Sequence, residues 1–243
     1  MIVLIITAVR VKSMDSHRIS GRILAENIAG PGMLRLVEQS MQSRARKTSV
    51  TEIAVKEWKH PQAALTFDDG PDIRYTPLLL DGLKERNVRV SFFLLGEKVE
   101  QYPELVERMQ KEGHLVGNHT YHHVQLNKLN ETKAREEILK TNNLIYETTG
   151  VYPLYLRPPF GAWKKNLELC VEMLPVFWTI DTLDWKVQNT EKIVRTVQEQ
   201  IEDGAIILMH DEYDTSVEAA LQVVDELKNQ GYELVTVDQL ILP

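Results

Sequence analysis

The segment AALTFDDGP, residues 63–71, begins the part of the chain that determines the fold. Its apolar run leads directly into Asp68 and Asp69, and Gly70-Pro71 then provides a turn signal. Short apolar runs typical of strands recur along the chain, at residues 88–95, 114–118, 153–156, 175–180, 205–209 and 232–237. Amphipathic helical patterns lie between them, at residues 76–86, 99–111, 131–149, 190–202 and 217–230.

This alternation predicts an α/β fold, because nearly continuous apolar strands separated by helices are typical of a parallel sheet covered by helices. About seven strand–helix units over roughly 180 residues fit a closed or nearly closed barrel better than an open sheet in two halves. We therefore expect a distorted (β/α) barrel with about seven parallel strands, similar to a TIM barrel. No glycine-rich loop for a dinucleotide or a phosphate follows any of these strands.

Residues 1–59 form an N-terminal extension outside this pattern, and residues 60–243 form the domain that contains it. The apolar start MIVLIITAV has nine residues, whereas a membrane-spanning helix needs about twenty. It also lacks the charged start and the cleavage site of a signal peptide. Three interpretations stay open for this start: the remnant of a membrane anchor, an edge strand, and an ordinary packing segment.

The composition is that of a globular protein, with 43% hydrophobic and 26% charged residues, and it excludes extensive disorder. Residues 1–60 carry ten Lys/Arg and five Asp/Glu, so the net charge of −7 arises in the remainder of the chain. An acidic main body argues against nucleic acid as a partner. The single cysteine, Cys170, excludes an intramolecular disulfide, and its apolar neighbours favour packing over nucleophilic chemistry.

Five predicted strands are each followed by a residue that can ionise or bind a metal. These residues are the pair Asp68 and Asp69, His119 with His123, Arg157, Asp181, and His210. The carboxyl ends of parallel strands lie on one face of a barrel, where active sites are built, so we expect these side chains to meet. One such residue alone would be an ordinary polar strand end, but five together indicate a site.

The segment HTYHH, residues 119–123, indicates a metal site. On a helical turn, His119 and His123 would lie on one face and could bind one ion together. Two imidazoles and a carboxylate leave coordination positions open, as hydrolytic sites require. Zn²⁺ is the expected ion, and Co²⁺, Ni²⁺ or Fe²⁺ suit the same ligands. The alternatives are a hydrated helix start for the histidines and a solvated turn for the aspartates.

Two further segments carry candidate site residues. In RPPFG, residues 157–161, the prolines lack N–H groups, so the first free amide belongs to Phe160 and could donate to an oxyanion. Arg157 could hold a carboxylate in one orientation. In DTLDW, residues 181–185, Asp181 could orient a histidine or an arginine, and Trp185 could pack against a sugar ring. The alternative for RPPFG is an ordinary surface loop, and the alternative for Trp185 is a partly buried aromatic residue of the core.

Five segments resemble, in order and in approximate spacing, the five motifs of the polysaccharide deacetylase family, which is carbohydrate esterase family four or the NodB homology domain. They are TFDDGP (66–71), HTYHH (119–123), RPPFG (157–161), DTLDW (181–185) and IILMH (206–210). The resemblance extends from about residue 60 to residue 242. Phe160 stands where many members have tyrosine, and the role at that position belongs to the backbone amide.

The resemblance implies a role for each of these residues. It implies that Asp69, His119 and His123 bind one divalent metal ion, that Asp68 is the general base, and that Arg157 holds Asp68 in place. The fold that it implies, a distorted (β/α) barrel, agrees with the alternation of strands and helices described above.

The same resemblance implies the acid side of the site and the substrate contacts. His210 is implied as the general acid, with Asp181 orienting it. The amide of Phe160 is implied to stabilise the oxyanion together with the metal. Trp185 and Leu208 are implied to line the pocket for the acetyl methyl group or the sugar face.

The implied activity is removal of N-acetyl groups from an amino-sugar polymer or oligomer, either peptidoglycan N-acetylglucosamine or a chitin oligosaccharide, with release of acetate. An O-acetyl xylan esterase on the same scaffold is the main alternative. An inactive wall-binding module and a non-haem iron oxygenase are further alternatives, since the oxygenases use a similar ligand set. We expect a monomer at the cell surface or outside the cell, with membrane or wall association through residues 1–59, and a cytoplasmic location also stays open.

Overall fold

The structure of the protein is a computed structural model, and it describes residues 60–163 and 173–241. The predictions for the extension at residues 1–59 and for Cys170 lie outside these residues. Within the described ranges, every helix is too short or too polar to cross a membrane.

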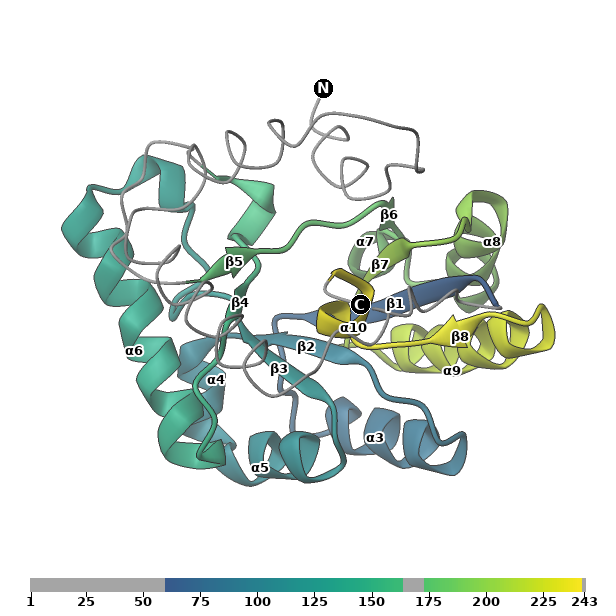
Figure 1. Cartoon of the computed structure of the whole chain (residues 1–243), viewed down its shortest axis with the longest axis horizontal. Helices are drawn as coiled ribbons and strands as arrows, with labels where there is room; N and C mark the ends of the chain where they lie inside the picture. The colour runs from purple at the N-terminus through teal and green to yellow at the C-terminus, as the bar shows by residue number, and fades with distance from the viewer. Residues whose placement is uncertain (1–59, 164–172, 242–243) are drawn as a thin grey trace, which may run out of the picture. The chain divides into compact units, whose positions relative to one another are not determined.

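The centre of the fold is one parallel sheet, in the order β5-β4-β3-β2-β1-β7-β6, with β8 pairing with β1 (Figure 1). Its strands are β1 (Gln62–Asp68), β2 (Ser91–Leu94), β3 (Leu115–Asn118), β4 (Tyr155–Leu156), β5 (Leu174–Pro175), β6 (Ile180–Asp181), β7 (Ala205–His210) and β8 (Glu233–Leu234). All of their pairings are parallel. The α/β class predicted from the alternation of strands and helices is therefore confirmed.

The predicted strand at residues 175–180 forms two strands at opposite edges of this sheet. Leu174–Pro175 pairs with β4, whereas Ile180–Asp181 pairs with β7. The chain between them crosses from one edge to the other (Figure 1). The sheet is thus a curled, distorted barrel, as predicted. The chain between β5 and β6 connects its two edges. This division also explains why the sheet has eight short strands where about seven were expected.

Helices surround the sheet, and most of them coincide with the predicted helical patterns. They are α3 (Tyr75–Glu85), α4 (Gly96–Gln101), α5 (Pro103–Lys111), α6 (Glu131–Thr149), α7 (Asp184–Val187), α8 (Thr190–Gln200), α9 (Asp214–Asn229) and α10 (Val237–Ile241). Short 3₁₀ turns occur at η2 (Leu126–Lys128) and η3 (Pro159–Gly161). The predicted helix 99–111 is divided in two because Pro103 has no amide to continue the hydrogen bonds of α4.

Helix α6 has the predicted bounds, and its ends show why. The side chain of Asn130 accepts a hydrogen bond from the amide of Lys133 at 2.9 Å, which caps the N-terminus. At the other end Gly150 adopts a left-handed conformation with φ of 72°, which terminates the helix. The bounds of this helix are therefore set by the residues at its two ends.

Strand β1 lies at the centre of the fold, and every one of its residues is buried. Leu65 and Phe67 belong to an apolar core that also includes side chains of α3, α8 and α9. Such a packed core holds the strands rigidly. Because the strands are parallel, β1, β3, β4, β6 and β7 all present their carboxyl ends at the same edge. The predicted site residues follow those ends.

Candidate active site

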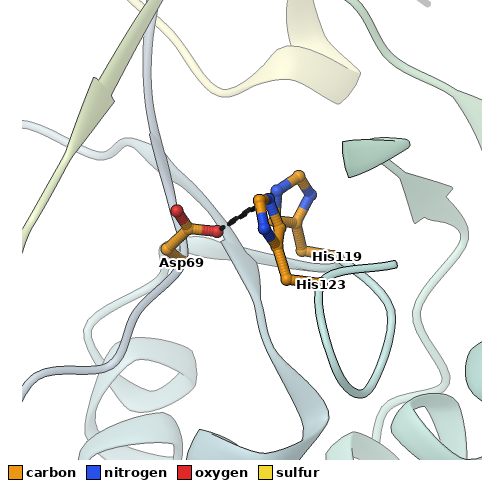
Figure 2. Close-up of side chains that lie close together, drawn as sticks. All are labelled: Asp69, His119 and His123. Carbon is orange, nitrogen blue, oxygen red and sulfur yellow. Dashed lines mark ion pairs between the residues drawn. The ribbon is translucent and has the colours of Figure 1, made fainter. Parts of the chain in front are cut away.

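Asp69, His119 and His123 meet at the carboxyl edge of the sheet (Figure 2). Oδ1 of Asp69 lies 3.4 Å from Nε2 of His119 and 3.4 Å from Nε2 of His123. The two imidazoles face the carboxylate from the same side, as Figure 2 shows. The structure therefore brings together the three side chains that the sequence indicated as metal ligands.

The chemistry of these three groups fits a divalent cation. Oδ1 of Asp69 is buried and has no hydrogen-bond partner among the described residues. Nδ1 of His119 lies 2.6 Å from the carbonyl oxygen of Arg157 and donates its proton there, so Nε2 keeps its lone pair for an ion. Burial lowers the pKa of His119 to about 3, although the charge of Asp69 opposes this shift. A neutral imidazole is the form that binds a metal.

The prediction of a helical turn for HTYHH is wrong, since residues 119–123 form an irregular bend. Thr120 and His123 have φ angles of 68° and 54°, in the left-handed region that residues with side chains rarely adopt. The amide of Gly96 donates to the carbonyl of Thr120 at 2.9 Å, so this carbonyl bonds to α4 rather than to a helix of its own. The bend brings both histidine Nε2 atoms to one carboxylate oxygen.

Asp68 is held by a buried arginine. Nη1 of Arg157 donates to Oδ1 of Asp68 at 2.8 Å and to Oγ1 of Thr66 at 2.7 Å. The guanidinium carbon lies 4.3 Å from the centre of the Phe93 ring, and the side chain of Arg157 is fully buried. Burial raises the pKa of Asp68, and the charges of Arg157 and His210 offset only part of this effect. A raised pKa brings the carboxylate closer to the range in which a general base is effective.

The residue that orients His210 is Asp184 and not Asp181, so this part of the sequence prediction is wrong. Nδ1 of His210 lies 2.7 Å from Oδ1 of Asp184, and the backbone amide of His210 donates to Oδ2 at 2.8 Å. The carboxylate of Asp181 instead accepts the amide of Leu183 at 3.0 Å. Leu183 has a left-handed φ of 52°, which turns the chain so that α7 begins with a buried Asp184 against β7. Both aspartates are in the DTLDW motif, but nothing in it shows which one reaches the histidine.

The environment of His210 keeps its imidazole protonated at neutral pH. Burial favours the neutral form, but the hydrogen bond and charge of Asp184, together with the charges of Asp68 and Asp69, raise the pKa of His210 to about 9. Its Nε2 atom lies 3.8 Å from Oδ2 of Asp69, so the proton faces the candidate metal ligands. A protonated imidazole in this position can act as a general acid.

Comparison with known proteins identifies the family of this chain. A sequence model described as "Polysaccharide deacetylase" matches residues 56–176. The peptidoglycan-N-acetylglucosamine deacetylase PgdA of Listeria monocytogenes is 40% identical over 205 residues, which cover 84% of this chain and 44% of PgdA. A peptidoglycan-N-acetylglucosamine deacetylase of Bacillus cereus is 40% identical over 186 residues, which cover 74% of this chain and 68% of that protein. The chain belongs to the polysaccharide deacetylase family.

A solved structure in this family agrees with the fold. The peptidoglycan-N-acetylmuramic acid deacetylase PdaC of Bacillus subtilis is 43% identical over 177 residues, which cover 73% of this chain and 38% of PdaC. A structure of PdaC superposes with a TM-score of 0.73 at 42% identity and covers 75% of this chain and 90% of that chain. The chain thus spans less than half of the length of PgdA and of PdaC.

Three other residues that the motifs of the family point to lie in different surroundings. Phe160 is exposed by 62%, and its ring centre lies 4.5 Å from that of the metal-ligand candidate His123. Trp185 is half-exposed and follows Asp184, the residue that holds His210. Leu208 is buried within β7. The roles of these residues in oxyanion and substrate binding stay predictions.

A glycine supports the turn that follows the aspartate pair of the deacetylase motif. A methyl group added to Gly70 would lie 2.5 Å from Oδ1 of Asp211, a buried carboxyl group that also accepts a hydrogen bond from Thr76. Burial raises the pKa of Asp211 to about 7. The close approach requires glycine at this position. Gly70 therefore lets the turn pack against Asp211 directly after Asp69, which itself has a left-handed φ of 69°.

Proposed function

We propose that this chain is a divalent-metal-dependent N-deacetylase that acts on the amino sugars of peptidoglycan. The observation that carries the proposal is the arrangement of a candidate base and a candidate acid around one metal-ligand set. Oδ2 of Asp68 lies 3.7 Å from Nε2 of His119, and Nε2 of His210 lies 3.8 Å from Oδ2 of Asp69. The three relatives described above are peptidoglycan deacetylases by name, and this favours peptidoglycan over chitin or xylan as the substrate.

The proposed cofactor is one Zn²⁺ ion held by Asp69, His119 and His123, since two imidazoles and a carboxylate are a typical zinc ligand set. When bound there, such an ion would polarise the acetyl carbonyl group and lower the pKa of the attacking water. The protein contributes a buried, unpartnered Oδ1 of Asp69 and a fixed tautomer of His119, both of which prepare the site for a cation.

The two remaining groups move the protons. Arg157 occupies Oδ1 of Asp68, and Oδ2 lies on the side of the metal ligands, where it can take a proton from the water that attacks the acetyl carbon. His210 then donates the proton on Nε2 to the sugar nitrogen as the amide C–N bond breaks, because a nitrogen anion is too poor a leaving group. The water supplies the hydroxyl group of acetate, and the sugar is left with a free amine.

Acetate release tests this proposal. The chain is expected to release acetate from peptidoglycan, and a chelator should abolish the release because the metal ligands then lose their ion. Added Zn²⁺ should restore it. Chitin oligomers and acetylxylan are assayed in parallel under the same conditions. Release that is insensitive to exhaustive chelation would refute the metal dependence, and release from acetylxylan alone would refute the N-deacetylase activity in favour of an ester hydrolase.

The proposed substrate also implies where the protein acts. Peptidoglycan lies outside the cytoplasmic membrane, so we propose that the enzyme acts on that side. The proposal rests on the substrate and not on residues 1–59. The monomeric state stays a prediction.

A further inference from the structure

A carboxylate outside the five motifs holds the loop that carries the two histidines. Glu137 lies in the second turn of α6, and its side chain is largely buried. Its Oε2 atom accepts the backbone amides of Tyr121 at 3.0 Å and of His122 at 2.9 Å. Its Oε1 atom lies 2.8 Å from Nδ1 of His122. The side chain of Glu137 thus binds the backbone amides of Tyr121 and His122 and the imidazole of His122, two residues that lie between His119 and His123.

The other side of the same loop is held by α4. The amide of Gly96 donates to the carbonyl of Thr120 at 2.9 Å, and the amide of Glu97 donates to the carbonyl of Tyr121 at 3.3 Å. Helix α4 packs against α6 (Figure 1). The loop is therefore bonded to two helices that contact each other. The carbonyls of Thr120 and Tyr121 are therefore bound by α4, whereas the amides of Tyr121 and His122 are bound by Glu137.

The two histidines differ in how they are anchored. The backbone amide of His119 donates to the carbonyl of Leu94 at 2.9 Å, and its Nδ1 donates to the carbonyl of Arg157, and neither contact involves Glu137. His123 contacts the rings of His119 and Phe160 and approaches Asp69, but no hydrogen bond from the rest of the described chain orients its imidazole. The position of His123 thus depends on the backbone that precedes it.

That backbone is in an unfavourable conformation. Thr120 and His123, on either side of the two residues bound by Glu137, both have left-handed φ angles. Such angles in residues with side chains persist only where surrounding contacts impose them. The carboxylate of Glu137 supplies two of those contacts, at the amides of Tyr121 and His122. The side chains of Asn118 and Thr120 bind the amides of Thr120 and Val124.

We propose that Glu137 is a positioning residue for the metal site. It acts through the backbone of Tyr121 and His122 to hold His123 against Asp69, and it does not touch the metal or the substrate. The inference rests on the proposed metal site. It predicts that removing the side chain of Glu137 weakens metal binding even though all three ligands are still present.

The chain offers a matched control for this prediction. Glu136 is adjacent to Glu137 on α6, carries the same charge and is exposed. Glu136→Ala therefore changes the net charge and the helix composition in the same way without touching the loop. Glu137→Gln keeps the shape of the side chain and one oxygen that can accept the two backbone amides, but its NH₂ group replaces the oxygen that faces Nδ1 of His122, so the hydrogen bond donated by that nitrogen is lost.

The experiment measures Zn²⁺ affinity of the full chain by competition with a chromogenic chelator, and it records the absorption spectrum of the Co²⁺-substituted protein. Glu137→Ala is expected to weaken Zn²⁺ binding by about 10- to 100-fold, the usual effect of losing a partner that orients a metal ligand. Glu137→Gln should weaken it by about 3- to 10-fold, and Glu136→Ala and Glu136→Gln by less than about twofold. The Co²⁺ spectrum of Glu137→Ala should change because His123 leaves the coordination shell.

The outcomes separate this inference from the proposed function. Wild-type affinity in both Glu137 variants would overturn the role of Glu137 and leave the metal site intact. Absence of Zn²⁺ binding in the wild-type chain would overturn the metal site and this inference with it. If Glu137→Ala does not fold, the comparison of Glu137→Gln with Glu136→Gln decides, and equal affinities in those two variants would overturn the inference.

Discussion

Replacing Asp68 with asparagine is expected to reduce acetate release by about 10²- to 10⁴-fold, the usual contribution of a general base, while bound Zn²⁺ is retained. Asparagine cannot accept a proton, but it preserves the size of the side chain and leaves Asp69, His119 and His123 unchanged. The measurement is kcat on acetylated peptidoglycan together with the metal content of the purified variant.

The same substitution is expected to lower stability, for a reason that the structure makes specific. Arg157 is fully buried, and Asp68 is the carboxylate that it binds. Removal of one partner of a buried ion pair typically costs about 3–5 kcal/mol, because the other charge is left uncompensated. A thermal melt of the variant should therefore show a lower midpoint than that of the wild type.

A control separates the loss of the base from a general effect of the substitution. Asp72 lies at the start of α3, where its Oδ1 atom accepts the amides of Arg74 and Tyr75 at 2.8 Å each. The oxygen of asparagine can accept the same hydrogen bonds, so Asp72→Asn should keep activity within about twofold. Undiminished turnover in a folded, metal-loaded Asp68→Asn variant would rule out Asp68 as the base.

Replacing Asp184 with asparagine is expected to reduce kcat by about 10²-fold or more, whereas Asp181→Asn should leave it within about twofold. Asp184 holds Nδ1 of His210 and supplies the nearby negative charge that favours its protonated form. Among the described residues, the carboxylate of Asp181 accepts only a backbone amide of the following turn, and asparagine can accept it too. The two variants have the same chemical change three residues apart.

The pH dependence gives a second readout of the same pair. His210 must be protonated to act as an acid, and its pKa is raised to about 9, so wild-type activity should persist through neutral pH and fall as the pH passes about 9. Asparagine at position 184 removes a negative charge that raises this pKa, so the fall in activity should move to lower pH. An unchanged pH profile in Asp184→Asn, or a shift in Asp181→Asn, would contradict the assignment of Asp184.

The architecture could be predicted because it depends on local patterns. The alternation of apolar runs and amphipathic helices is a property of neighbouring residues. It leads to a parallel sheet whatever the order of the strands in that sheet. In such a sheet the strand ends share one edge, so Asp68, His119, Arg157 and His210 were expected together and lie together in the structure. The bounds of α6 were also predictable, since Asn130 and Gly150 mark its ends.

Other features depend on contacts between residues far apart in the chain. The run at residues 175–180 is apolar except for Thr179, so the pattern of its residues could not show that its two ends pair with β4 and β7 at opposite edges. The spacing of His119 and His123 fits a helical turn. Instead the loop forms a bend, in which the carbonyl of Thr120 accepts a hydrogen bond from Gly96 and the amide of Tyr121 donates one to Glu137.

The sequence pattern thus predicted the fold class, the edge on which the candidate site lies and most of its candidate residues, because these depend on strand direction and on which residues follow each strand. Tertiary structure decided which aspartate holds His210 and which carboxylate supports the histidine loop. Those choices depend on backbone angles such as the left-handed φ of Leu183, and on side chains such as Glu137, which reach the site from distant parts of the chain.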